Sequence, residues 1–250
     1  TGLRINKAGD DAAGMAISER LKNQVRGLNQ AQRNAQDGIS LIQTAEGAMG
    51  EAHNLLARMR ELAVQAANDT VTSTDRSNIL TEFTSLYAEI DRIATSTQFN
   101  GVAILTGGST ALSLQIGANS NNSLVNDNVI SLNITPGGSF YASVLSPTMT
   151  DMGVTSQSVA NLAISTLDAA INAVSTARTS VGSMQSRLES ASRSIAVASE
   201  NAAAANSRIA DADIASSMSE LVRAQILQQA GISVLAQANQ APSLVLQLLK

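Results

Sequence analysis

Residues 17–63 decide the fold, and they read ISERLKNQVRGLNQAQRNAQDGISLIQTAEGAMGEAHNLLARMRELA. Apolar residues recur in this stretch at steps of three or four, about every 3.5 residues, which is the period of a coiled-coil seam. Asp10 and Asp11 stand just before it, where carboxylates favour a helix N-terminus. We therefore predict one long helix over residues 10–68, ending near the sequence Asn68-Asp69-Thr70.

The same period returns in two later stretches, which predict helices over residues 74–96 and 158–205. Thr74 or Asp75 is the expected N-cap of the shorter helix. Asn100-Gly101 indicates a turn after that helix. Apolar residues then alternate with polar ones, which predicts a β-hairpin over about 111–134. Residues 135–157 lose any period and are rich in Ser and Thr, so we expect an exposed, irregular connection.

Composition supports a mainly α fold. The chain is 44% hydrophobic but only 2% aromatic, with no Trp and no Cys, so closely packed helices of Ala, Leu, Ile, Val and Met are favoured. The predicted architecture is an elongated, rod-like bundle of long coiled-coil-type helices with a small β-hairpin region. A formal net charge of −4 argues against nucleic acid, and no apolar run is long enough to span a membrane.

A fourth apolar seam lies at the C-terminal end of the chain. Three seams can close a core domain over residues 1–206, and this leaves the fourth seam without a partner in the chain. We predict that residues 207–250 form a helix that binds another molecule by its apolar stripe. The seam consists of Leu227, Ala230, Val234, Ala238, Ala241, Val245 and Leu248, with Leu249 beside it.

The residues that carry most enzyme chemistry are scarce. His53 is the single histidine, with no Cys and no cluster of carboxylates around it, so metal binding is not expected. Asp10 and Asp11 are adjacent on a helix and point in different directions, which suits capping better than paired acid–base catalysis. The sequence HExxH does not occur. We predict no enzymatic activity, no catalytic residues and no cofactor.

Several blocks of the sequence resemble those of bacterial flagellins, the subunits of the flagellar filament. The resemblance covers about 1–134 and 158–250, with the blocks in the family's order. The blocks are GLRIN and GDDAAG in residues 2–14, DGISLIQTAEG at 37–47, RMRELAVQAAN at 58–68, QFNG at 98–101, NSRI at 206–209 and LAQANQAP at 235–242.

This resemblance implies a structural subunit that is secreted and assembles into the bacterial flagellum for motility. In flagellins the terminal segments form a coiled-coil inner tube, so residues 207–250 would be a C-terminal polymerisation segment. The implied partners are other flagellin subunits and an export chaperone. The sequence shows no cleavable secretory signal, so secretion would follow a route other than the general pathway. Flagellins carry a few dozen residues before the motif at which this chain begins, and many have large outer domains. We therefore expect a chain that lacks its N-terminal segment and has almost no outer variable domain.

The resemblance also implies a receptor surface. Residues 58–68 match a block that the flagellin-sensing Toll-like receptor recognises, which makes Arg58, Leu62 and Glu89 the expected central contacts. Leu62 lies between charged neighbours and has the pattern of an interface anchor. Because the same surface packs subunits together in the filament, assembly is the primary interpretation.

Two alternative functions stay open. A hook–filament junction protein shares flagellin-like ends, although the nearly complete central blocks favour flagellin. A flagellin-like cell-surface protein could instead bind a polysaccharide, but Trp and Tyr, the usual sugar-stacking residues, are scarce.

Overall fold

The computed structural model describes residues 2–106, 112–120, 128–134 and 154–248, with side chains up to Asn239. This described part has four α-helices: α1 (Ala12–Ala66), α2 (Ser73–Ser96), α4 (Gln157–Ala210) and α5 (Ile214–Leu248). The prediction of a mainly helical chain with long helices is confirmed. By its contacts the chain divides into two compact units, one of Gln24–Ser199 and one that joins Thr1–Asn23 to Glu200–Lys250.

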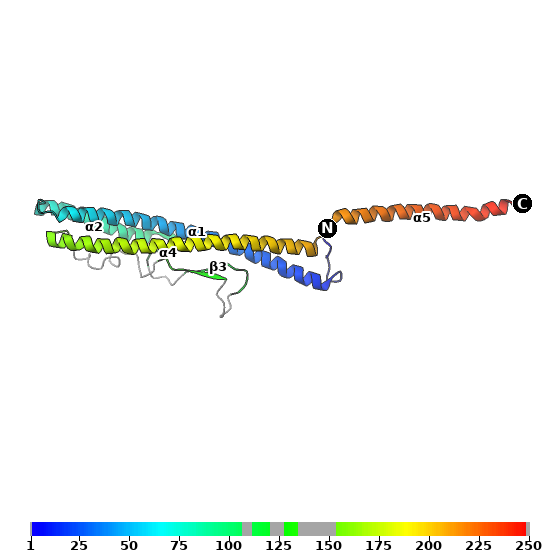
Figure 1. Cartoon of the computed structure of the whole chain (residues 1–250), viewed down its shortest axis with the longest axis horizontal. Helices are drawn as coiled ribbons and strands as arrows, with labels where there is room; N and C mark the ends of the chain where they lie inside the picture. Colours follow the sequence, from blue (N-terminus) through cyan, green and yellow to red (C-terminus); the bar gives the residue numbers. More distant parts are fainter. Residues whose placement is uncertain (1, 107–111, 121–127, 135–153, 249–250) are drawn as a thin grey trace. The chain divides into compact units, whose positions relative to one another are not determined.

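In the first unit, α1, α2 and α4 lie alongside one another (Figure 1). α1 and α4 are antiparallel: the Arg60 Nε donates to the Asp168 Oδ1 at 2.6 Å, and the Ser199 hydroxyl donates to the Asn29 Oδ1 at 2.9 Å. Large aliphatic side chains fill the space between the three helices, and alanines let the helices approach closely. Fully buried members include Ile42, Met49, Leu56, Met59, Ile90, Leu167, Val174 and Leu188, together with Ala45, Ala52, Ala63, Ala163 and Ala170.

Side chains close the helix ends. Asp11 accepts a hydrogen bond at 2.9 Å from the backbone N–H of Gly14, which confirms that this carboxylate caps α1. The expected cap of α2 was wrong: Thr72 is the N-cap, and Asp75 is the third helical residue of a capping box with it. Hydrogen bonds from the Thr72 hydroxyl and backbone lower the pKa of Asp75.

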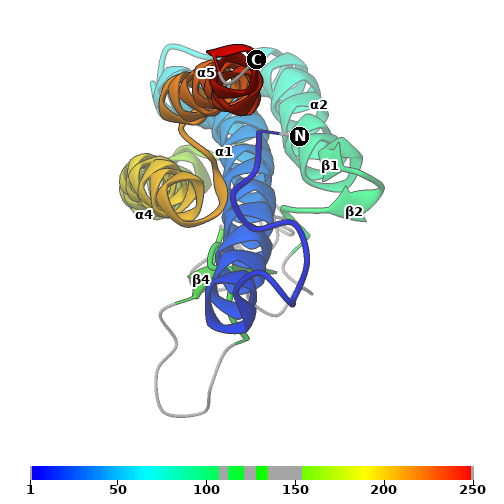
Figure 2. The ribbon, with the colours of Figure 1, turned by 90° about the vertical axis from the view of Figure 1, so that its right-hand side faces the viewer.

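Two short antiparallel strand pairs occur among the described residues. The predicted hairpin is confirmed, because β3 (Leu112–Gln115) pairs with β4 (Val129–Leu132), with Leu114 opposite Ile130. A second pair, β1 (Gln98–Phe99) with β2 (Val102–Ala103), lies beside α2 (Figure 2) and was not predicted. Its two-residue turn is Asn100-Gly101, at φ 50° and 76°, a conformation that this dipeptide favours.

The backbone next to β3 rests directly on α1. A Cβ placed on Gly27 would lie 2.8 Å from the Cβ and 3.2 Å from the Cα of Ala118. The Asn34 amide of α1 donates to the carbonyl of Gln115, the last residue of β3, at 2.9 Å. The absence of a side chain at Gly27 therefore gives this segment room to pack on the helix surface.

The connection before α4 differs in part from expectation. Residues 135–153 lie outside the described residues. Val154 is fully buried in the core, so the expectation of an exposed segment was wrong at this residue. α4 begins at Gln157 and runs through Ala210, five residues beyond the predicted end. The Ala-rich residues 201–205 are strong helix formers and carry no stop signal.

Two glycine substitutions test the contact between α1 and the hairpin segment. Gly27→Ala should lower the free energy of unfolding, because the Ala118 backbone would have to move, and overpacking of this kind costs about 1–3 kcal/mol. Gly50→Ala is the matched control, since no atom lies within 4 Å of its added Cβ. It should stabilise the helix by about 0.4–1 kcal/mol. Equal stabilisation by both substitutions in urea unfolding would contradict this packing.

The helical core should dominate stability over the hairpin. Leu188→Ala removes a fully buried side chain and should cost about 2–5 kcal/mol. Leu114 is only partly buried on β3, so Leu114→Ala should cost less. Thermal melts that rank the two substitutions in the opposite order would refute the bundle as the main source of stability.

Candidate functional site

α5 exposes many large apolar side chains to water. Every described side chain from Ile214 to Asn239 is exposed, and Leu227 and Val234 keep 65% and 67% of their surface in solvent. The whole helix carries two charged residues, Glu220 and Arg223. A helix of this composition is marginal alone in water and gains stability only when it is covered.

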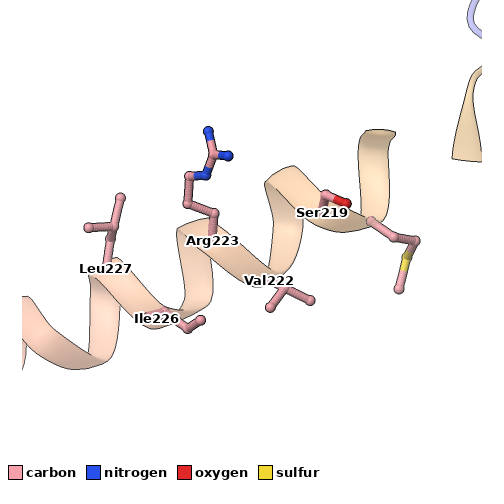
Figure 3. A pocket seen from close by; sticks show the side chains of 6 residues that line it. Ser219, Val222, Arg223, Ile226 and Leu227 are labelled. Carbon is pink, nitrogen blue, oxygen red and sulfur yellow. The ribbon is translucent and has the colours of Figure 1, made fainter. Parts of the chain in front are cut away.

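The apolar residues of α5 lie on more than one side of the helix. Figure 3 shows Val222 and Ile226 on one side, and Arg223 and Leu227 on the other. The sequence had predicted one seam through Leu227 and Val234. The structure adds a second stripe, which contains Ile214, Met218, Leu221, Val222, Ile226 and Ile232. A helix that is apolar on all sides is normally buried on all sides, so α5 is suited to more than one neighbour.

The spacing of Met218, Val222 and Ile226, four residues apart each time, was the signal for this second stripe. Of the other residues predicted for assembly, Val245 and Leu248 lie in the last turns of α5, where side chains are not among those described. Leu249 lies outside the described residues.

Of the three residues predicted for receptor binding, Arg58 is exposed and Glu89 is partly exposed. The Arg58 guanidinium lies 3.0 Å from Glu61 on its own helix and 2.9 Å from Glu82 on α2. Glu89 forms a two-pronged pair with Arg92, at 2.7 and 2.5 Å. Hydrogen bonding to Arg92 lowers the pKa of the Glu89 carboxyl.

Leu62 does not lie on this surface. Only 2% of its area is exposed, and it packs in the core with Met59. The interpretation of Leu62 as an exposed anchor was therefore wrong. Its charged neighbours in the sequence point outward, whereas its position on the seam turns it inward, as the helical period requires.

The structure places other residues beside Arg58 and Glu89. Glu82 comes from α2 and was not predicted, because nothing in the sequence indicates which residue of α2 faces Arg58. A hollow of about 380 Å³ lies between α1 and α2 next to Glu89. Its lining combines charged and apolar groups, among them Glu51, Leu55, Arg92 and Ile93.

Other candidate sites are ordinary packing positions. Met49 and Met59 are fully buried, as the seam predicted. His53 is partly buried on α1. Within the described ranges, no three potential metal-ligating side chains come together. None of the described helices combines the length and apolarity that a membrane crossing requires.

Sequence comparisons cover the whole chain. The profile of the bacterial flagellin N-terminal helical region matches residues 1–110, and that of the bacterial flagellin C-terminal helical region matches residues 164–249. A flagellin of Halalkalibacterium halodurans is 48% identical over all of this chain and 89% of its own length. The flagellin of Bacillus subtilis is 42% identical, with 100% of this chain and 90% of its own length covered.

Solved structures agree with the fold. The crystal structure of Bacillus cereus flagellin is 32% identical with a TM-score of 0.55, over 65% of this chain and 88% of its own. A protein described as flagellar hook-associated, from Vibrio parahaemolyticus, has a TM-score of 0.65 over 81% of this chain and 100% of its own. That protein is only 15% identical, so the likeness concerns the fold alone.

Proposed function

This chain belongs to the bacterial flagellin family and is a structural subunit of the exported, extracellular flagellar filament, and we propose that α5 is the element through which it polymerises. The observation that carries the proposal is the exposure of apolar side chains on all sides of a nearly uncharged helix. Each Val, Leu or Ile removed from water contributes about 1.5–3 kcal/mol. Burial of many such residues can therefore offset the loss of translational and rotational freedom when one subunit joins another.

The proposal divides the chain by role. Residues 1–206 form the core that gives the subunit its stable body, and residues 207–250 form the polymerisation segment. Met218, Val222 and Ile226 face one neighbour, while Leu227 and Val234 face a different one, with Val245, Leu248 and Leu249 extending the contact. A helix covered on several sides is held in an assembly more firmly than one that docks by a single stripe.

The same helix has a role before assembly. An export chaperone would cover the apolar residues of α5 inside the cell and release them to neighbouring subunits after secretion. The support is physical: an exposed apolar surface of this kind promotes aggregation unless a partner covers it. The assembled filament then serves motility.

The surface around Arg58 is the proposed contact for the flagellin-sensing Toll-like receptor. Arg58 on α1 forms an ion pair with Glu82 on α2, and Glu89 lines the hollow between the same two helices. Assembly remains the primary role of this surface.

Charge placed on α5 should abolish polymerisation. Leu227→Asp with Val234→Asp would put an unpaired charge into each apolar contact, which is costly when buried. The double variant should form no filaments in electron micrographs, while the thermal melting of residues 24–199 stays unchanged. Gln228→Glu with Gln237→Glu is the matched control, because it adds the same two negative charges to the helix without removing an apolar group.

The dilute subunit offers an independent check of the same proposal. Proteases should cleave residues 207–250 quickly in the free monomer, and added chaperone or polymerisation should protect them. A tail that resists protease in dilute monomer would mean that α5 folds onto its own subunit and is not an assembly element.

Receptor binding should depend on the charged side chains of Arg58 and Glu89. Arg58→Ala with Glu89→Ala should weaken receptor activation at matched protein concentration and leave the melting temperature close to that of the parent. Leu62→Ala should instead lower the free energy of unfolding by about 2–5 kcal/mol, because it opens a cavity in the core. Full activation by the Arg58 and Glu89 double variant would refute the proposed contact.

A further inference from the structure

The break between α4 and α5 has no obvious cause in the local sequence. α4 ends at Ala210 and α5 begins at Ile214, yet no Gly or Pro occurs between Gly182 and Gly231. Asp213 is a good N-cap and accepts a hydrogen bond at 3.1 Å from the Ser216 N–H. An aspartate is also tolerated inside a helix, at a cost well below that of Pro. The local sequence therefore allows either a break or one continuous helix.

A distant segment takes the hydrogen bonds that a continuous helix would need. In an unbroken α-helix, the Ala212 N–H would bond to the Arg208 carbonyl, and the Ile209 and Ala210 carbonyls would accept from residues 213 and 214. Instead, the Ala212 N–H donates to the Gly2 carbonyl at 3.0 Å. The Arg4 guanidinium donates to the Ile209 carbonyl at 2.8 Å.

Arg4 also supplies the third of these hydrogen bonds, because its backbone N–H donates to the Ala210 carbonyl at 2.7 Å. Leu3 and Asp211 thus form an isolated antiparallel bridge. The positive guanidinium also lies at the carbonyl end of α4, where the helix dipole favours a cation.

Residues 2–5 are themselves anchored. Ile5 is buried, with its Cδ1 only 2.7 Å from the place that a Cβ on Gly14 would take in the first turn of α1. Asp10 accepts hydrogen bonds from the backbone N–H groups of Lys7 and Asn6, at 2.9 and 3.0 Å, and these bonds lower the pKa of its carboxyl. Gly2 has a φ of +70°, which suits glycine.

We infer that residues 2–5 act as a clip that imposes the break between α4 and α5, with Arg4 as the positioning residue. The clip supplies partners for the three backbone groups that a continuous helix would pair within itself. Without it, α4 and α5 join into one helix through residues 211–213. The break lets α5 take a direction of its own, and this consequence for assembly rests on the proposed function of α5.

The test uses the whole chain and backbone NMR. Arg4→Pro removes both the guanidinium and the backbone N–H of residue 4. The Cα chemical shifts of Ala212 and Asp213 should move to helical values, and filament formation should be lost. Arg4→Ala removes the guanidinium alone and should give a smaller shift. Arg20→Ala is the matched control, because the Arg20 side chain donates to the Ala16 carbonyl of its own helix and to no group of residues 209–212, so it should change neither readout.

A second substitution tests whether the effects of Arg4→Pro arise from loss of the helix break or from a general loss of stability. Ile214 is the first residue of α5, a position where Pro is favoured, whereas Pro there would interrupt a continuous helix. Adding Ile214→Pro to Arg4→Pro should return residues 211–213 to non-helical shifts and restore filaments. Rescue of this kind is not expected if Arg4 only stabilises the fold.

The outcomes discriminate clearly. Non-helical shifts at Ala212 and Asp213 in Arg4→Pro would overturn the clip, because the local sequence would then impose the break. A continuous helix that still forms filaments would uphold the clip and overturn its role in assembly. Failure of the proposed function itself would appear separately, as filaments from the Leu227→Asp, Val234→Asp variant.

Discussion

The antiparallel packing of α1 on α4 is the contact on which the rest of the subunit depends. Met59 on α1 and Leu167 on α4 are fully buried, as are Ala52 and Ala170, whose small side chains permit close packing of helices. The ion pair of Arg60 with Asp168 across this seam is about half exposed and contributes little beside such a core. α2 and the hairpin add to a surface that these two helices create.

This dependence explains why the period of the sequence predicted so much. A seam of 3.5 residues is a local property, so the long helices and the buried methionines could be predicted without knowledge of their neighbours. The turn at Asn100-Gly101 was equally local. The strands β1 and β2 beside it are only two residues each, too short to leave a pattern of their own.

The features that the sequence did not predict depend on contacts between distant segments. Glu82 is one of several exposed polar residues of α2, and only the packing of that helix brings it to Arg58. Leu62 was misassigned because its charged neighbours drew attention away from its place on the seam. The end of α4 at Ala210 is set by residues 2–5, about 200 positions away in the chain, so no window of local sequence contains it.

α5 and α1 differ in how apolar and charged residues are distributed around the helix. Both helices are long, but α1 turns one apolar side to the core and charged residues such as Arg58 to water, while α5 has apolar residues on all sides. A core helix needs one partner surface, and its solvated face keeps the subunit soluble. α5 has no such face, and in its proposed role neighbouring subunits would cover it from several directions. That requirement also gives a reason for the break at residues 211–213. If α5 simply continued α4, its direction would be fixed by the core, and a separate helix can instead align with its neighbours.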